Sequence, residues 1–187
     1  MSVSKDDARS ALHDVETAER RSQTLFGYGL ASPYLLLWGV LWVVAGAVGA
    51  ASPANAGIVW GAVDIVGLAG TGWLIVRHAR RCGERDDRVR LFRYVGSATA
   101  VAAFSGLTLM VFAPAEGGEI TMFFTLLVAA GYAIVGCWLG LRFAAVGAAL
   151  GGLAVAVFVA APAYLHLIVP FAGGAALVLG GLWMRRA

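Results

Sequence analysis

Residues 120–160 read ITMFFTLLVAAGYAIVGCWLGLRFAAVGAALGGLAVAVFVA and contain one charged side chain, that of Arg142. A helix that crosses the hydrocarbon layer of a membrane, about 30 Å thick, needs about 20 mostly apolar residues. The stretch is long enough for two such helices, at 120–140 and 143–160, with only Leu141 and Arg142 between them. A connection this short predicts two antiparallel helices that form a tight hairpin.

The rest of the chain follows the same pattern. Hydrophobic residues make up 60% of the sequence and charged residues 13%, whereas about a quarter of the residues in soluble proteins are charged. Four more stretches are long and apolar enough to span a membrane, at 26–50, 57–76, 94–112 and 164–184. They lack the alternation of a membrane barrel, and lipid offers the backbone no hydrogen-bonding partner, so helices are expected. The sequence therefore predicts an all-α membrane protein in which residues 26–187 form one compact bundle of six transmembrane helices.

Positive charge marks one side of the predicted bundle. All fourteen Lys and Arg residues lie before the first span, between the second and third, between the fourth and fifth, or after the sixth. The other three connections, at 52–55, 113–118 and 161–162, contain none. Basic residues beside spans are retained in the cytoplasm during insertion. We therefore expect both termini in the cytoplasm and a multi-pass protein of the cell membrane, most simply the inner membrane of a bacterium.

Residues 1–25 are polar and do not have the pattern of a cleavable signal peptide. Ser4 is suited to cap a helix, and the carboxylates of Asp6 and Asp7 suit the positive end of its dipole. Small apolar residues then recur at helical spacing, at Ala8, Ala11, Leu12, Val15 and Ala18. The pattern predicts a short amphipathic helix on the cytoplasmic side, which either leads into the bundle or contacts a partner. The first role is favoured because a stripe made mostly of alanine binds weakly.

The connection 77–93 is the only charge-rich loop. Basic side chains beside a span are attracted to anionic lipid headgroups by about 1 kcal/mol each. We expect its seven arginines to contact such headgroups or a partner protein, and we expect no nucleic-acid binding. They are Arg77, Arg80, Arg81, Arg85, Arg88, Arg90 and Arg93.

Small residues are expected to set the helix contacts, because helices in lipid approach closely only where side chains are small. The candidates are Gly46 and Ala50 in the first span, Gly67, Gly70 and Gly72 in the second, Gly147 and Gly151 in the fifth, and Gly173, Gly174, Gly180 and Gly181 in the sixth. Pro170 removes a backbone hydrogen bond to the carbonyl of His166. Together with Gly173 and Gly174, it makes the sixth span the candidate for a kink or hinge.

Asp64 is the main ionisable residue within a span, and such a residue is by default a candidate for function. Trp42, Ser105 and Thr125 lie at similar depth in the outer half, and His166 lies nearer the outer surface. One hypothesis is a site in which Asp64 binds a cation or carries a proton, with His166 as a second titrating group. The alternative is a structural hydrogen bond between helices, for example from the Trp42 indole to Asp64. The sequence leaves both open.

Motifs for catalysis are not found. The chain has no phosphate-binding glycine loop, dinucleotide fingerprint, His-Glu-x-x-His or Cys/His cluster, so we expect no metal, no cofactor and no enzymatic activity. The favoured hypothesis is a small carrier or channel-type protein with an outer-half site around Asp64. The alternative is a non-catalytic membrane partner or regulatory subunit that acts through its basic cytoplasmic face. Both functions are compatible with a homo-oligomer.

Overall fold

Six long helices make up the computed structural model, which describes residues 5–82, 88–114 and 117–186. They are α1 (Lys5–Ala51), α2 (Ala56–Cys82), α3 (Arg88–Phe112), α4 (Gly117–Leu139), α5 (Leu141–Ala160) and α6 (Leu165–Arg185). Each is long and apolar enough to cross a membrane. The expectation of an all-helical, six-span integral membrane protein is therefore confirmed.

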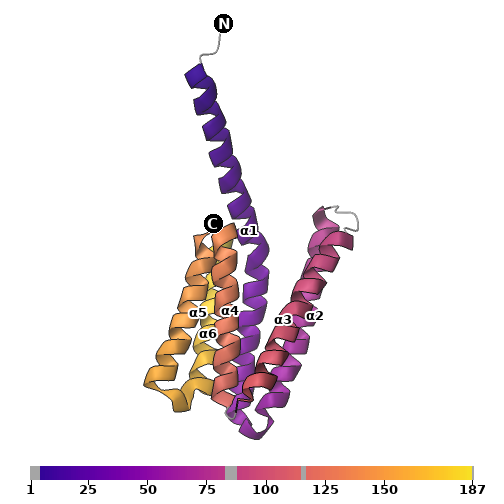
Figure 1. The fold of residues 1–187 in the computed structure, drawn as a ribbon, viewed down its shortest axis with the longest axis vertical. Coiled ribbons are helices and arrows are strands. Elements are labelled where there is room, and N and C mark those ends of the chain that lie inside the picture. Colours follow the sequence, from indigo (N-terminus) through magenta and orange to yellow (C-terminus); the bar gives the residue numbers. More distant parts are fainter. Residues whose placement is uncertain (1–4, 83–87, 115–116, 187) are drawn as a thin grey trace.

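The helices run alternately up and down, and both ends of the chain lie at the same end of the molecule (Figure 1). Two short 3₁₀ helices, η1 (Pro53–Asn55) and η2 (Pro162–Tyr164), make two of the turns at the opposite end. Each begins with a proline, whose fixed φ and missing N–H suit the first position of a helix. We refer below to the terminal end and the opposite end of the molecule.

The N-terminal segment differs from the expected short, separate helix. α1 runs without a break from Lys5 to Ala51, and its membrane-span portion is Gly27–Ala51. The residues before Gly27 include no proline or glycine that would end a helix, so it continues beyond the bundle by roughly 33 Å at 1.5 Å per residue (Figure 1). That this portion acts as an amphipathic surface helix stays a prediction.

Four helices, α1, α4, α5 and α6, pack as a bundle, which confirms the expected helical bundle for this part of the chain. The most extensive pairs are α1 with α6 and α4 with α5. The second pair is the predicted hairpin, and its turn passes through Gly140 at a φ of 125°. The largest fully buried side chains at the centre of the bundle include those of Leu35, Leu150 and Leu177.

Glycines set the closest helix contacts. A Cβ added to Gly39 of α1 would lie 2.7 Å from the carbonyl oxygen of Gly174 in α6, and one added to Gly174 would lie 2.7 Å from that of Gly39. Gly46 meets Pro170 in the same pair of helices. The predicted small-residue contacts are confirmed at Gly46, Gly67, Gly70, Gly147, Gly173, Gly174, Gly180 and Gly181. Gly151 is in ordinary van der Waals contact with Ala129, whereas Ala50 and Gly72 are exposed, so these last two predictions are wrong.

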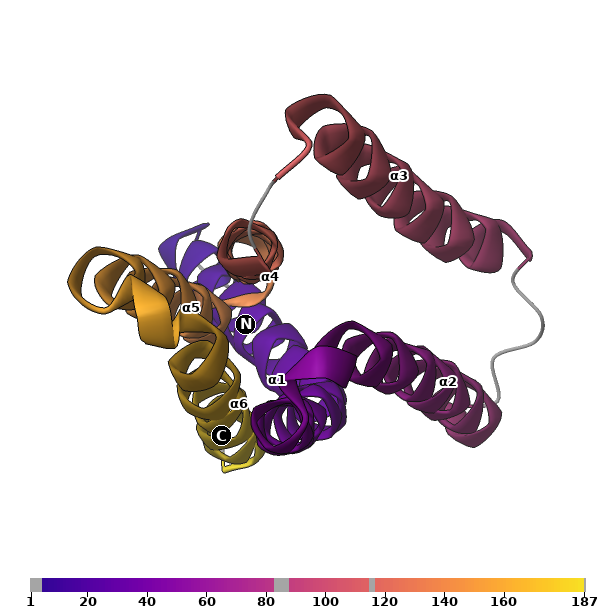
Figure 2. The same cartoon turned by 90° about the horizontal axis from the view of Figure 1, so that it is seen from below.

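The bundle is less compact than the sequence suggested, because α3 stands apart from it and α2 packs mainly on α1 (Figure 2). α2 packs on α1 along one stripe, where the Trp38 ring covers Gly67 and its Nε1 donates to Thr71 Oγ1 at 3.1 Å. α3 makes few contacts with any other helix. In its most apolar stretch 6% of the residues are buried, whereas in the corresponding stretch of α6 the share is 44%. Apolar surface gains nothing by leaving lipid, and a Cβ added to Gly96 or Gly106 of α3 would meet no neighbour within 4 Å, so no close helix contact holds α3 in the bundle.

Candidate functional site

Asp64 lies on α2, beside the stripe that contacts α1. Val63 and Gly67 on that stripe are buried, whereas Asp64 is exposed. It follows Trp60 by one helical turn, and the Trp60 ring meets the buried Trp42 ring edge to face, with centroids 6.2 Å apart. Among the described residues, no side chain forms a hydrogen bond or ion pair with the Asp64 carboxylate. The position presents an acid to whatever surrounds α2 in the membrane.

Trp42 and Asp64 are both described residues, and the predicted hydrogen bond from the Trp42 indole to the Asp64 carboxylate is not formed. Trp42 instead packs between helices, because its ring contacts Trp60 of α2 and packs against Gly173 of α6. Its role in the structure is therefore packing at the junction of α1, α2 and α6.

The other predicted polar residues are spread over three helices. Thr125 of α4 is buried, and its hydroxyl donates to the carbonyl of Thr121 in the same helix at 2.7 Å. Ser105 is buried on α3, and His166 is exposed at the start of α6. Among the described residues, no interaction joins any of these three side chains to Asp64. Within the described residues, these side chains therefore do not form a polar site around the acid.

The hinge candidates lie in the interface between α6 and α1. Pro170, Gly173 and Gly174 are all buried, and α6 continues as a helix through them. Each contacts α1, with Pro170 against Gly46 and Gly174 against Gly39. The three residues give α6 a narrow face that lets α1 approach; that they form a hinge stays a prediction.

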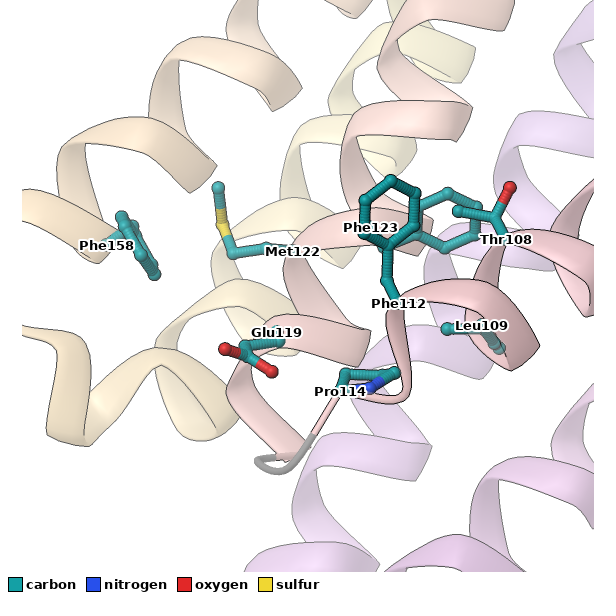
Figure 3. Close-up of a pocket in the computed structure, with 8 residues that line it drawn as sticks. All are labelled: Thr108, Leu109, Phe112, Pro114, Glu119, Met122, Phe123 and Phe158. Carbon is teal, nitrogen blue, oxygen red and sulfur yellow. The ribbon is translucent and has the colours of Figure 1, made fainter.

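A hollow of about 530 Å³ opens at the opposite end, where the ends of α3, α4 and α5 come together (Figure 3). Its walls are apolar apart from Thr108 and Glu119. The apolar lining residues are Leu109, Phe112, Pro114, Met122, Phe123 and Phe158. It is an open surface without an acid, base and nucleophile set, and it suits an acyl chain or the apolar side chain of a neighbouring helix.

The basic residues lie toward the terminal end. Arg77 of α2 stacks on the Trp73 ring, with its Cζ 5.0 Å from the ring centroid, and Arg80 is exposed one turn further on. The remaining predicted contact residues, Arg81, Arg85, Arg88, Arg90 and Arg93, have side chains outside the described residues. Two exposed cations and an indole at the end of a span suit contact with lipid headgroups.

One residue of clear importance was not singled out from the sequence. Arg142, in the first turn of α5, donates from Nη1 to the carbonyl oxygen of Trp183 in α6 at 2.7 Å. Its guanidinium lies over the rings of both Trp183 and Tyr28, so it joins α5, α6 and α1. The available signal was its position as the single charge in residues 120–160.

No protein family, curated protein or solved structure matches the chain. Among the described residues, no group of three or more His, Cys, Asp or Glu side chains is placed to hold a metal ion.

Proposed function

We propose that this protein is a non-catalytic subunit of a membrane assembly, and that α2 and α3 bind a neighbouring membrane protein. The observation that carries the proposal is the isolation of α3. It is apolar enough to span the membrane, yet it makes few contacts with the rest of the described chain. The hollow beside Phe112 and Phe123 extends this unpartnered surface onto α4 and α5.

The exposure of Asp64 favours a protein neighbour, rather than lipid, on this side of α2. It lies eight residues after the start of α2, or roughly 12 Å along the helix axis. An acid near the middle of a span costs about 2.5–3.5 kcal/mol on insertion scales when it faces lipid. A donor from a neighbouring helix would offset this cost, and α2 leaves Asp64 exposed to such a neighbour.

Charge also indicates what kind of partner this is. In the proposed orientation all fourteen Lys and Arg residues lie beside the other ends of the spans, so a second copy with the same orientation would offer no lysine or arginine at the depth of Asp64. We therefore favour a different membrane protein that presents a basic or hydrogen-bond-donating side chain in its outer half. In the proposed orientation both termini are cytoplasmic, which follows from the basic residues of that end.

The test is to extract the tagged full-length chain from its native membrane in polymer-bounded lipid discs. We expect a stoichiometric membrane partner, whose recovery falls about tenfold for Asp64→Leu, as loss of one polar contact in lipid of 1–2 kcal/mol predicts. Asp64→Asn retains a hydrogen-bonding group and should retain more of the partner. His166→Leu removes an exposed polar side chain of α6, away from α2, α3 and the hollow, and serves as the control. Recovery of the wild-type chain alone would contradict the proposal.

The second candidate is a small carrier or channel that is completed only in an oligomer. It is favoured by the combination of an exposed Asp64 with connections at the opposite end that contain no basic residue, an arrangement that attracts cations. Purified protein in proteoliposomes should then conduct protons or a monovalent cation, and Asp64→Asn should abolish the flux while the protein stays folded. Full flux in that variant would remove Asp64 from such a mechanism.

A further inference from the structure

The terminal end of the bundle contains a fixed positive charge. Nη1 of Arg142 donates to the Trp183 carbonyl oxygen at 2.7 Å, and its Cζ lies 4.9 Å from the Trp183 ring and 5.2 Å from the Tyr28 ring. Its backbone N–H also faces the Tyr28 hydroxyl oxygen, at 3.4 Å. These contacts restrain both ends of the residue, so its guanidinium is held in place.

The guanidinium retains donors for a ligand. Arginine has five N–H groups and stays protonated in proteins, and one of these groups is used for Trp183. No Asp or Glu occurs after Glu119 in the whole chain. Among the described residues, no carboxylate pairs with Arg142. Within the described part of the chain this fixed cation has no counter-charge, so it is suited to bind an anion from outside the chain.

Two more cations and two helix ends lie at the same end of the bundle. Arg185 and Arg186 are exposed at the end of α6, two and three residues after Trp183. The backbone N–H of Arg186 donates to the same Trp183 carbonyl that accepts from Arg142, so the negative end of α6 is capped. α5 begins at Leu141, which places Arg142 at the positive end of that helix dipole.

We propose that Arg142, Arg185 and Arg186 bind the phosphate of an anionic phospholipid headgroup. Guanidinium N–H groups match phosphate oxygens in geometry and charge. Trp183 and Tyr28 have rings that suit the boundary between headgroups and acyl chains, which places the site at the level of lipid phosphates. Basic sites between spans on the cytoplasmic side bind such headgroups, and the cytoplasmic leaflet is the anionic one. The site lies at the opposite end of the spans from Asp64 and does not depend on α2 or α3.

The test is native mass spectrometry of the purified full-length protein, titrated with phosphatidylglycerol or with phosphatidylcholine of the same acyl chains. We expect one anionic lipid to bind at least about tenfold more tightly than the zwitterionic one. The double variant R185A/R186A, which leaves the Arg142 contacts intact, should lose most of this preference. R142K should retain the fold and weaken binding, because an ammonium lacks the planar fork. The comparison variant R77A/R80A removes the two exposed cations of α2, which also suit headgroup contact, and should lower the preference less than R185A/R186A does.

Three results would overturn the proposal. Equal affinity for the two lipids would show that the headgroup charge is not recognised. An equal loss of preference in R77A/R80A and R185A/R186A would show a diffuse effect of surface charge. Thermal stabilisation by inorganic phosphate that R185A/R186A abolishes, without any preference between lipids, would assign the site to free phosphate instead.

Discussion

Gly39 and Gly174 face each other so closely that neither has room for a methyl group. A Cβ on either residue would lie 2.7 Å from the carbonyl oxygen of the other. The contact lies between α1 and α6, the most extensively packed pair of helices in the described chain. The approach of two backbones is the main means by which helices attract each other in lipid, so this pair is central to the stability of the bundle.

Gly39→Ala and Gly174→Ala should therefore each destabilise the protein. Overpacking against backbone atoms costs about 1–3 kcal/mol, to be measured as a lower midpoint of unfolding in mixed detergent micelles. The matched control is Gly29→Ala in the same helix, because a Cβ there has no neighbour within 4 Å. It should be neutral or stabilising by up to about 1 kcal/mol, since alanine favours helix more than glycine. Equal loss in all three variants would contradict the assigned contact.

Arg142→Ala should loosen the terminal end of the bundle. The change removes a charge-assisted hydrogen bond, worth about 1.5–3 kcal/mol when protected from water and less at this partly exposed site. The unfolding midpoint of the variant in detergent should fall. Arg186→Ala removes the same charge but keeps the backbone hydrogen bond to Trp183, so it should change stability little. If both variants behaved alike, net charge alone would explain the effect.

Gly140→Ala should disrupt the hairpin of α4 and α5. Gly140 has φ 125° and ψ 157°, a conformation that is open essentially to glycine alone. An L side chain there should cost about 1–3 kcal/mol and displace the Arg142 side chain two residues later. We expect a lower unfolding midpoint, together with a changed Trp183 fluorescence. Wild-type stability in Gly140→Ala would show that the turn has a different conformation.

Ala113→Gly should increase the stability of the protein, in contrast to Gly140→Ala. Ala113 follows α3 at a φ of 41°, in the left-handed region that costs an L residue about 1–2 kcal/mol. Glycine removes this cost and is the usual residue just past a helix end. Thermal unfolding of the variant should occur at a slightly higher temperature than that of the wild type. A decrease would argue that the end of α3 is not in this conformation.

The sequence predicts the spans well because their length and composition follow directly from membrane thickness. It also predicts several glycine contacts, since Gly46, Gly173 and Gly174 are small residues on long apolar helices. It does not predict that α3 stands apart, because a helix face that meets lipid and one that meets protein are equally apolar. For the same reason the depth of Asp64 could be calculated, whereas its direction around α2 could not.

Arg142 illustrates a second limit of sequence reasoning. Its charge places it at a membrane boundary, but its contacts with Tyr28 and Trp183 join positions 114 and 41 residues away in the chain. Such contacts depend on how three helices are packed against each other. The N-terminal helix shows the converse case: favourable local propensity extends α1 through the expected boundary near residue 25.

The most direct test of the central claim, that α3 is covered by another membrane protein, is photo-cross-linking in native membranes. A benzophenone amino acid would replace Leu107 or Met110 on α3, whose side chains are 63% and 80% exposed, and Val159 on α5 or Leu179 on α6 as controls, at 77% and 66%. We expect a discrete adduct with a different membrane protein from both α3 positions, weakened by Asp64→Leu, and lipid adducts alone from the controls. Lipid adducts alone from all four positions, or adducts of α3 with a second copy of the chain, would contradict it.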